Sequence, residues 1–147
     1  MTRLAAVVAS LLLVCGASLP AAQKPSFAGT WIIQPPNKAA GTERTIKQDD
    51  KTLTITTLSK TATYLLDGVD HRDTKQMRDG QAVIFTRAAW EKDTVVISFV
   101  TLYPSGMKTF ERETWSIDAK GQLVIELAET AQGQPVSSMK IVHKKKN

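Results

Sequence analysis

The strongest candidates for acid–base chemistry in the sequence are Glu111 and Glu113. Residues two apart in a strand point to one face with Cα atoms roughly 6.5 to 7 Å apart, a spacing at which two carboxylates can cooperate in glycosidic cleavage. Catalytic carboxylates usually flank a cleft from different strands, so we expect these two on the wet face, matched by Lys or Arg across the strands. If the face that carries Trp115 and Ile117 points inward, the acids instead line a polar cavity.

Other catalytic and metal-binding patterns are missing from the sequence. The two histidines, His71 and His143, form no His-x-His or His-Glu-x-x-His spacing, and no Gly-x-Ser-x-Gly motif is present. Asp67, Asp70 and Asp73 cluster around His71, but without the Asp-x-Asp-x-Asp-Gly pattern of a calcium loop. We therefore expect no enzyme activity, no metal site and no cofactor.

Residues 1–22 have the features of a secretory signal peptide. A short positively charged start precedes an apolar run over 4–14, and small residues gather near Ala21 and Ala22. The run is shorter than the roughly 20 residues that span a bilayer, and no later run approaches that length, so we expect no integral membrane segment. The only cysteine, Cys15, lies in this region, and lipid attachment there is the alternative to cleavage near Gln23. The prediction is a secreted or periplasmic domain over 23–147 without disulfides.

The net charge of +5 does not indicate a nucleic-acid partner. Four of the 19 basic residues are Arg3, in the signal segment, and Lys144, Lys145 and Lys146 near the C-terminus, so the rest of the chain is nearly neutral. A nucleic-acid surface needs Lys and Arg gathered on one face with aromatic residues between them. The basic end is expected to keep a final strand soluble.

The hydrophobic pattern after the signal segment has a period of two and predicts an all-β domain. Stretches such as Thr52–Thr57 and Thr94–Val100 are rich in β-branched residues, and no segment carries a helical stripe. Strands are expected near 29–34, 43–48, 52–58, 61–66, 82–90, 94–102, 107–117, 122–129 and 136–143.

Short turns link these strands, which predicts antiparallel order. Parallel neighbours would need long crossover connections, which the sequence lacks. Two longer polar segments, 35–41 and 67–80, are expected to be loops. An up-and-down meander of eight to nine strands must hide its edges, either by curling into a barrel or by stacking two sheets.

Three short motifs resemble those of lipocalins and their calycin relatives, in particular small secreted bacterial lipocalin-like proteins. They are Phe27-Ala28-Gly29-Thr30-Trp31 at the first strand, Leu66-Asp67-Gly68, and Glu113-Thr114-Trp115-Ser116. The resemblance implies a β-barrel in which Trp31 packs across the closed end and a late basic residue lies over its ring. Lys140 is the candidate for that cation, with His143 or Lys144 as alternatives. The sequence departs from larger lipocalins in lacking a disulfide and a C-terminal helix.

Two strands are apolar on both faces, which points to a covered outer face or to an internal cavity. In 94–102, Val95, Ile97 and Phe99 form one face and Val96, Val100 and Leu102 the other, and 82–90 repeats this ambiguity. An eight-stranded barrel either fills its interior with side chains or holds one small ligand.

The function expected from this sequence is non-catalytic binding of a small apolar or amphipathic molecule. Phe85, Phe99 and Trp115 are the ligand-binding candidates. The alternative is a filled barrel that acts as a structural or protein-interaction module of the cell envelope. The inward face of the strands, the identity of the ligand and the oligomeric state stay open.

Overall fold

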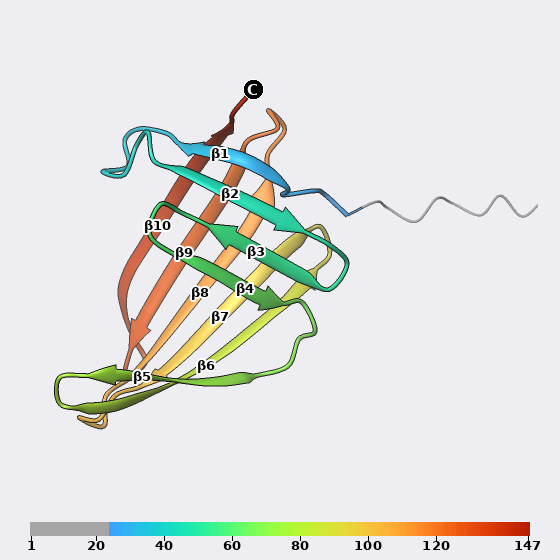
Figure 1. The fold of residues 1–147 in the computed structure, drawn as a ribbon. Coiled ribbons are helices and arrows are strands. Elements are labelled where there is room, and N and C mark those ends of the chain that lie inside the picture. Colours follow the sequence, from blue (N-terminus) through green and yellow to red (C-terminus); the bar gives the residue numbers. More distant parts are fainter. Residues whose placement is uncertain (1–23) are drawn as a thin grey trace, which may run out of the picture.

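The computed structural model describes residues 24–147, so the predicted signal segment and Cys15 lie outside the described residues. All regular structure in this part of the chain is β-structure, in one antiparallel sheet of ten strands (Figure 1). Residues 24–147 contain no helix that is long and apolar enough to cross a membrane. The strands are β1 (Gly29–Ile33), β2 (Glu43–Gln48), β3 (Thr52–Thr56), β4 (Thr61–Leu65), β5 (His71–Met77), β6 (Gly80–Glu91), β7 (Thr94–Leu102), β8 (Lys108–Ile117), β9 (Leu123–Ala131) and β10 (Gln134–Lys145).

The sheet is an up-and-down meander, as predicted, but it is not a closed barrel. The strand order is β4-β3-β2-β1-β10-β9-β8-β7-β6-β5, so every strand pairs with its sequence neighbour except β4 with β5, and β1 pairs with β10. A closed ten-stranded barrel would require one more ladder, between β4 and β5. We call the gap between these two strands the seam.

Curling of the sheet brings its two ends together over a common core. Figure 1 shows the short strands β1–β4 lying across the long strands β6–β10. Leu53 and Ile55 of β3 are buried, while the alternate residues Thr54 and Thr56 pair through their hydroxyls with Thr63 and Thr61 of β4 on the outer face. The buried cluster draws on both parts of the sheet and consists of Phe27, Trp31, Ile46, Leu53, Ile55, Ala88, Val95, Ile97, Trp115, Leu123 and Ile125.

One strand was not expected from the sequence. β5 falls inside the segment 67–80 that was predicted to be a loop, and it raises the strand count to ten. It pairs only with β6 and lies at an edge of the sheet, and all its residues except Met77 are exposed. Because neither face of β5 is buried, its sequence carries no apolar alternation.

Aromatic residues close one end of the curled sheet, which we call the aromatic end. The Phe27 ring stacks on Trp90 at 5.7 Å between centroids and meets Trp115 edge-on at 6.4 Å. Trp31 is 2% exposed, and its Nε1–H donates to the carbonyl oxygen of Phe27 at 2.7 Å. The Phe27 amide donates to Gln48 Oε1 at 2.7 Å, which fixes the segment before β1 inside the sheet.

Candidate functional site

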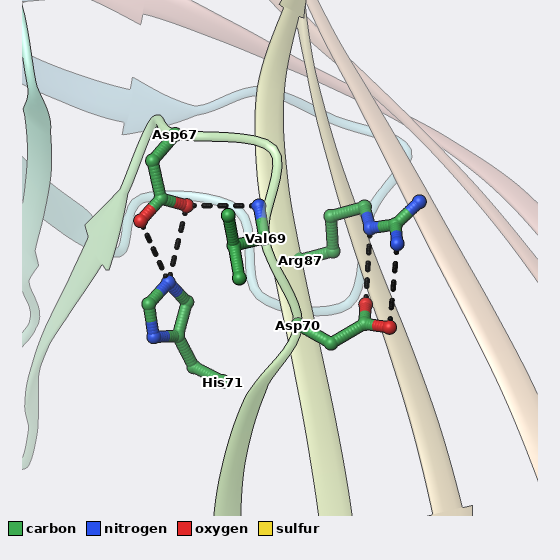
Figure 2. Close-up of polar contacts among 5 residues, drawn as sticks. All are labelled: Asp67, Val69, Asp70, His71 and Arg87. Carbon is green, nitrogen blue, oxygen red and sulfur yellow. Dashed lines mark hydrogen bonds and ion pairs between the residues drawn. The ribbon is translucent and has the colours of Figure 1, made fainter.

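A short turn bridges the seam and is held by polar contacts (Figure 2). The Gly68 amide donates to the carbonyl oxygen of Ala88 in β6 at 2.9 Å. The Asp67 carboxylate accepts the Val69 amide at 3.0 Å, and His71 Nε2 lies 2.9 Å from its Oδ2. The Val69 amide, and next His71, hold the pKa of Asp67 below its usual value.

An ion pair fastens the same turn to the outer side of β6. Arg87 donates through Nε and a terminal nitrogen to the two carboxylate oxygens of Asp70, at 3.0 and 3.3 Å (Figure 2). Both side chains are about half exposed, at 55% each. The seam is therefore joined by a turn and exposed polar contacts where a closed barrel would have a ladder of strand hydrogen bonds.

Behind the seam lies a cavity of about 750 Å³ on the inner face of the sheet. Its walls come from β4 on one side and from β5, β6, β7 and β8 on the other, so it exists because the sheet curls without closing. The lining combines small and apolar residues, hydroxyl groups and charges: Lys60, Thr61, Ala62, Thr63, Tyr64, Leu65, His71, Arg72, Asp73, Ile84, Thr86, Ala88, Phe99, Thr101, Glu111 and Glu113.

Two aromatic rings meet across the interior at this cavity. Tyr64 of β4 and Phe99 of β7 pack edge-to-face, with centroids 6.0 Å apart and an interplanar angle of 75°. Aromatic pairs prefer this arrangement because the positive edge of one ring faces the negative face of the other. Burial, and next the negative charges of Glu113 and Glu111, raise the pKa of Tyr64.

The acid pair singled out in the sequence lies on this inner face. Glu111 and Glu113 follow the same alternation as buried Trp115, so the polar-cavity interpretation applies and the expected solvent-face placement is wrong. Trp115 Nε1–H donates to Glu113 Oε2 at 2.7 Å. Burial is the main cause that raises the pKa of both carboxyls. The negative charge of Glu111 further raises the pKa of Glu113, and the negative charge of Glu129 further raises the pKa of Glu111.

Arg44 of β2 supplies a positive charge that attracts Glu113. Its guanidinium carbon lies 5.9 Å from the centre of the Trp115 ring, within the range of a cation–π contact. Burial lowers the pKa of Arg44, and the attraction of Glu113 opposes that shift. A smaller cavity of about 150 Å³ lies beside these groups and is lined by Arg44, Tyr64, Glu113 and Trp115 among others.

A buried histidine lies in the same interior. His143 of β10 is 0% exposed, and within residues 24–147 neither of its ring nitrogens has a hydrogen-bond partner. Burial, and next the charge of Arg44, lower its pKa to about 4. His143 is therefore neutral at pH 7.

No group of three or more His, Cys, Asp or Glu side chains in the described part of the chain is arranged to hold a metal ion.

The structure separates the three predicted ligand-binding residues. Phe99 lines the cavity, and Trp115 lies deeper on the same face against Phe27. Phe85 lies on the outer face of the sheet, where it is the cross-strand partner of Val100. The period of two places Phe85 and Phe99 on opposite faces, because Phe99 is paired with Thr86, the residue after Phe85.

Trp31 lies at the aromatic end, but its cation is not Lys140. The ammonium nitrogen of Lys145, the cross-strand partner of Trp31, lies 5.5 Å from the centre of the ring. Lys140 pairs with Glu126 at 3.4 Å. The reason is strand alternation, since Lys140 is an odd number of positions from Lys145 and so points to the other face of β10.

The sequence interpretation missed Tyr64 and Arg44 as parts of the site. Arg44 had a detectable signal, since it lies two positions before Ile46 and so shares the face of that apolar residue. Tyr64 had a weaker signal in the sequence, because the inward direction of its side chain depends on the curl of the sheet.

In comparisons with known proteins, the chain matches no family model and no curated protein, so the lipocalin resemblance stays a prediction.

Proposed function

We propose that this protein binds a small amphipathic molecule, without catalysis, in the cavity behind the seam. The observation that carries the proposal is the size and lining of that cavity. Ligand sites typically measure roughly 300 to 1,000 Å³ and combine apolar walls with a few polar groups. The cavity has about 750 Å³, with Tyr64, Phe99 and Ile84 among its apolar walls and Glu111 and Glu113 as half-buried polar groups.

The wider setting of this proposal is a lipocalin-like carrier secreted from the cell or held in the periplasm. The Gly29-Thr30-Trp31 motif and the segment 1–22 support it. In this view the open seam is the ligand entrance. A carrier needs only reversible non-covalent contacts, and the acids on β8 serve as contacts for the ligand.

Binding of a neutral, environment-sensitive dye tests the proposal. N-phenyl-1-naphthylamine should bind with micromolar affinity and increase its fluorescence, as expected of an apolar molecule in a preformed cavity. Phe99→Asp should weaken binding at least tenfold, because it places a charge in the cavity wall. Val100→Asp is the matched control on the outer face and should leave the affinity within twofold.

A third variant separates loss of the site from loss of the fold. Thr101→Trp should block the cavity without removing a core side chain, and far-ultraviolet circular dichroism checks that all three variants keep their sheet. The proposal fails if the dye does not bind up to its solubility limit. It also fails if Phe99→Asp and Val100→Asp change the affinity equally while both stay folded.

A second candidate function is a protein-interaction module. It is favoured by the apolar residues on the outer face of β6–β8, where Phe85 and Phe110 flank Val100 on neighbouring strands. Phe110 and Leu102 are 38% and 39% exposed, which is high for large apolar side chains in a sheet. Failure of the dye to bind would favour this candidate.

A further inference from the structure

The cavity behind the seam has an asymmetric distribution of charge. Of the six acidic or basic residues that line it, four are exposed and belong to its rim, namely Lys60, His71, Arg72 and Asp73. The two that are not exposed are Glu111 and Glu113. A molecule that enters the cavity therefore meets carboxylates in its interior.

These inner carboxylates are only partly compensated by the protein. Glu113 accepts the indole N–H of Trp115 and is attracted by Arg44, whereas Glu111 has no ion-pair partner within 4 Å in residues 24–147. The cross-strand partner of Glu111 on β9 is a third carboxylate, Glu129. Half-buried charges of one sign without a counter-ion are costly, so a positive ligand group would gain free energy here.

Aromatic rings stand directly beside the uncompensated acid. Phe99 is the cross-strand partner of Glu111 on β7, and in such pairs the Cβ atoms are about 5 Å apart. Tyr64 packs edge-to-face on Phe99 from the opposite wall. Ring faces attract alkylammonium groups, and their apolar carbon atoms accept the adjoining part of the ligand. The pair of rings is an observation separate from the acidic residues, and it too favours a cation attached to an apolar body.

We infer that the cavity selects a protonated amine with a short apolar or aromatic body. The ammonium group pairs with Glu111 and Glu113, and the body lies against Phe99, Tyr64 and Ile84. This inference rests on the proposed function and adds the chemical class of the ligand. An organic anion is disfavoured, because Lys60 and Arg72 at the rim are exposed and the carboxylates lie further inside.

Three phenylalkyl ligands of similar length and different charge test the inference. 4-Phenylbutylamine, 4-phenylbutanol and 4-phenylbutyrate are titrated against the wild-type protein by calorimetry at pH 7.5, where the amine is protonated. We expect the amine to bind at least tenfold more tightly than the alcohol, and the carboxylate to bind most weakly. Glu111→Gln should weaken amine binding about tenfold and change alcohol binding by less than twofold.

Glu126→Gln is the matched control, because Glu126 lies on the other face of β9 and pairs with Lys140. It should leave all three affinities unchanged. If the alcohol or the carboxylate binds as tightly as the amine, the cation preference is overturned while the proposed function stands. If none of the three binds and the neutral dye does not bind either, both are overturned. Should Glu111→Gln not fold, the three ligands on the wild-type protein still decide.

Discussion

The aromatic end and the seam belong to one sheet, yet they are held by different interactions. At the aromatic end, Phe27 and Trp31 are buried, and Trp31 Nε1–H has its partner inside the protein. At the seam, the contacts include the exposed pairs Asp70–Arg87 and Asp67–His71 and a turn with one backbone hydrogen bond to β6. Burial of large rings contributes several kcal/mol, whereas exposed ion pairs contribute about 0 to 1 kcal/mol.

The comparison shows that the stability of the fold and its cavity depend on different regions of the sheet. Stability concentrates where the curled sheet is filled with rings, and the adjoining region behind the seam keeps an unfilled cavity. Regions with few buried apolar contacts open at a lower free energy than the core, which is what an entrance for a ligand requires. Three predictions can break or sharpen this division.

The largest effect is expected at the aromatic end. Trp31→Ala should lower the free energy of unfolding by about 3 to 5 kcal/mol, because it leaves a cavity in a packed core and removes the hydrogen bond to Phe27. Urea denaturation measures the loss. Val69→Ala, in the exposed turn at the seam, is the control and should change stability by less than about 0.5 kcal/mol. A loss below 0.5 kcal/mol for Trp31→Ala would show that the aromatic end does not stabilise the sheet.

The next effect concerns buried His143 and its dependence on pH. Its pKa is about 4 in the folded protein and near 6.5 when unfolded, so between these values the unfolded chain binds more protons. The stability that depends on neutral His143 is complete above pH 6.5 and falls, by roughly 3 kcal/mol, as the pH drops to 4.

The variant His143→Leu isolates this contribution. Glu111 and Glu113, whose pKa values are raised, contribute with the opposite sign as the pH falls, and they do so in both proteins. As the pH falls from 7 to 4, the unfolding free energy of the wild type should therefore decrease relative to that of the variant. A difference that is constant with pH would contradict the assignment of a neutral, buried His143.

The smallest effect is expected at the seam. Asp70→Asn removes the ion pair with Arg87 and should cost at most about 1 kcal/mol, a loss that shrinks further in high salt. Hydrogen exchange should show the Gly68 amide, which bonds to Ala88 of β6, exchanging faster in this variant than in the wild type. A loss as large as that of Trp31→Ala would mean that the seam is a structural element equal to the aromatic end.

The strands that bury one face were predictable from sequence, because burial leaves a period of two. Leu53 and Ile55 within Thr52–Thr56, for example, identify β3 at once, and its predicted start is the observed one. β5 was not predictable in this way, since an edge strand with polar residues on both faces has no such period. The open seam was equally hidden, because strand patterns show neighbours and do not show whether the last ladder forms.

The candidate site was predictable only in part. Phe99 was a predicted ligand contact, whereas the pair Glu111 and Glu113 was singled out but expected on the solvent face, because the direction of each side chain depends on which face of β7 and β8 turns inward. Where both faces of a strand are apolar, as in β7, the pattern does not show which face points inward. Phe85 was for this reason grouped with Phe99 as a ligand-binding candidate, although the two lie on opposite faces of the sheet. Tyr64 reaches the site from a strand distant along the sheet, which only the three-dimensional curl reveals.

The pairing of β1 with β10 has a consequence for how the chain folds. Every other ladder joins strands that follow one another in the sequence, but Glu43 and Lys146, which form an ion pair near this junction, are 103 positions apart. Contacts between distant positions slow folding, because a long loop must close before they form. During synthesis one edge of β1 has no partner until β10 has been made. The joining of the first strand to the last is thus the expected late step, and it completes the curl that creates the cavity.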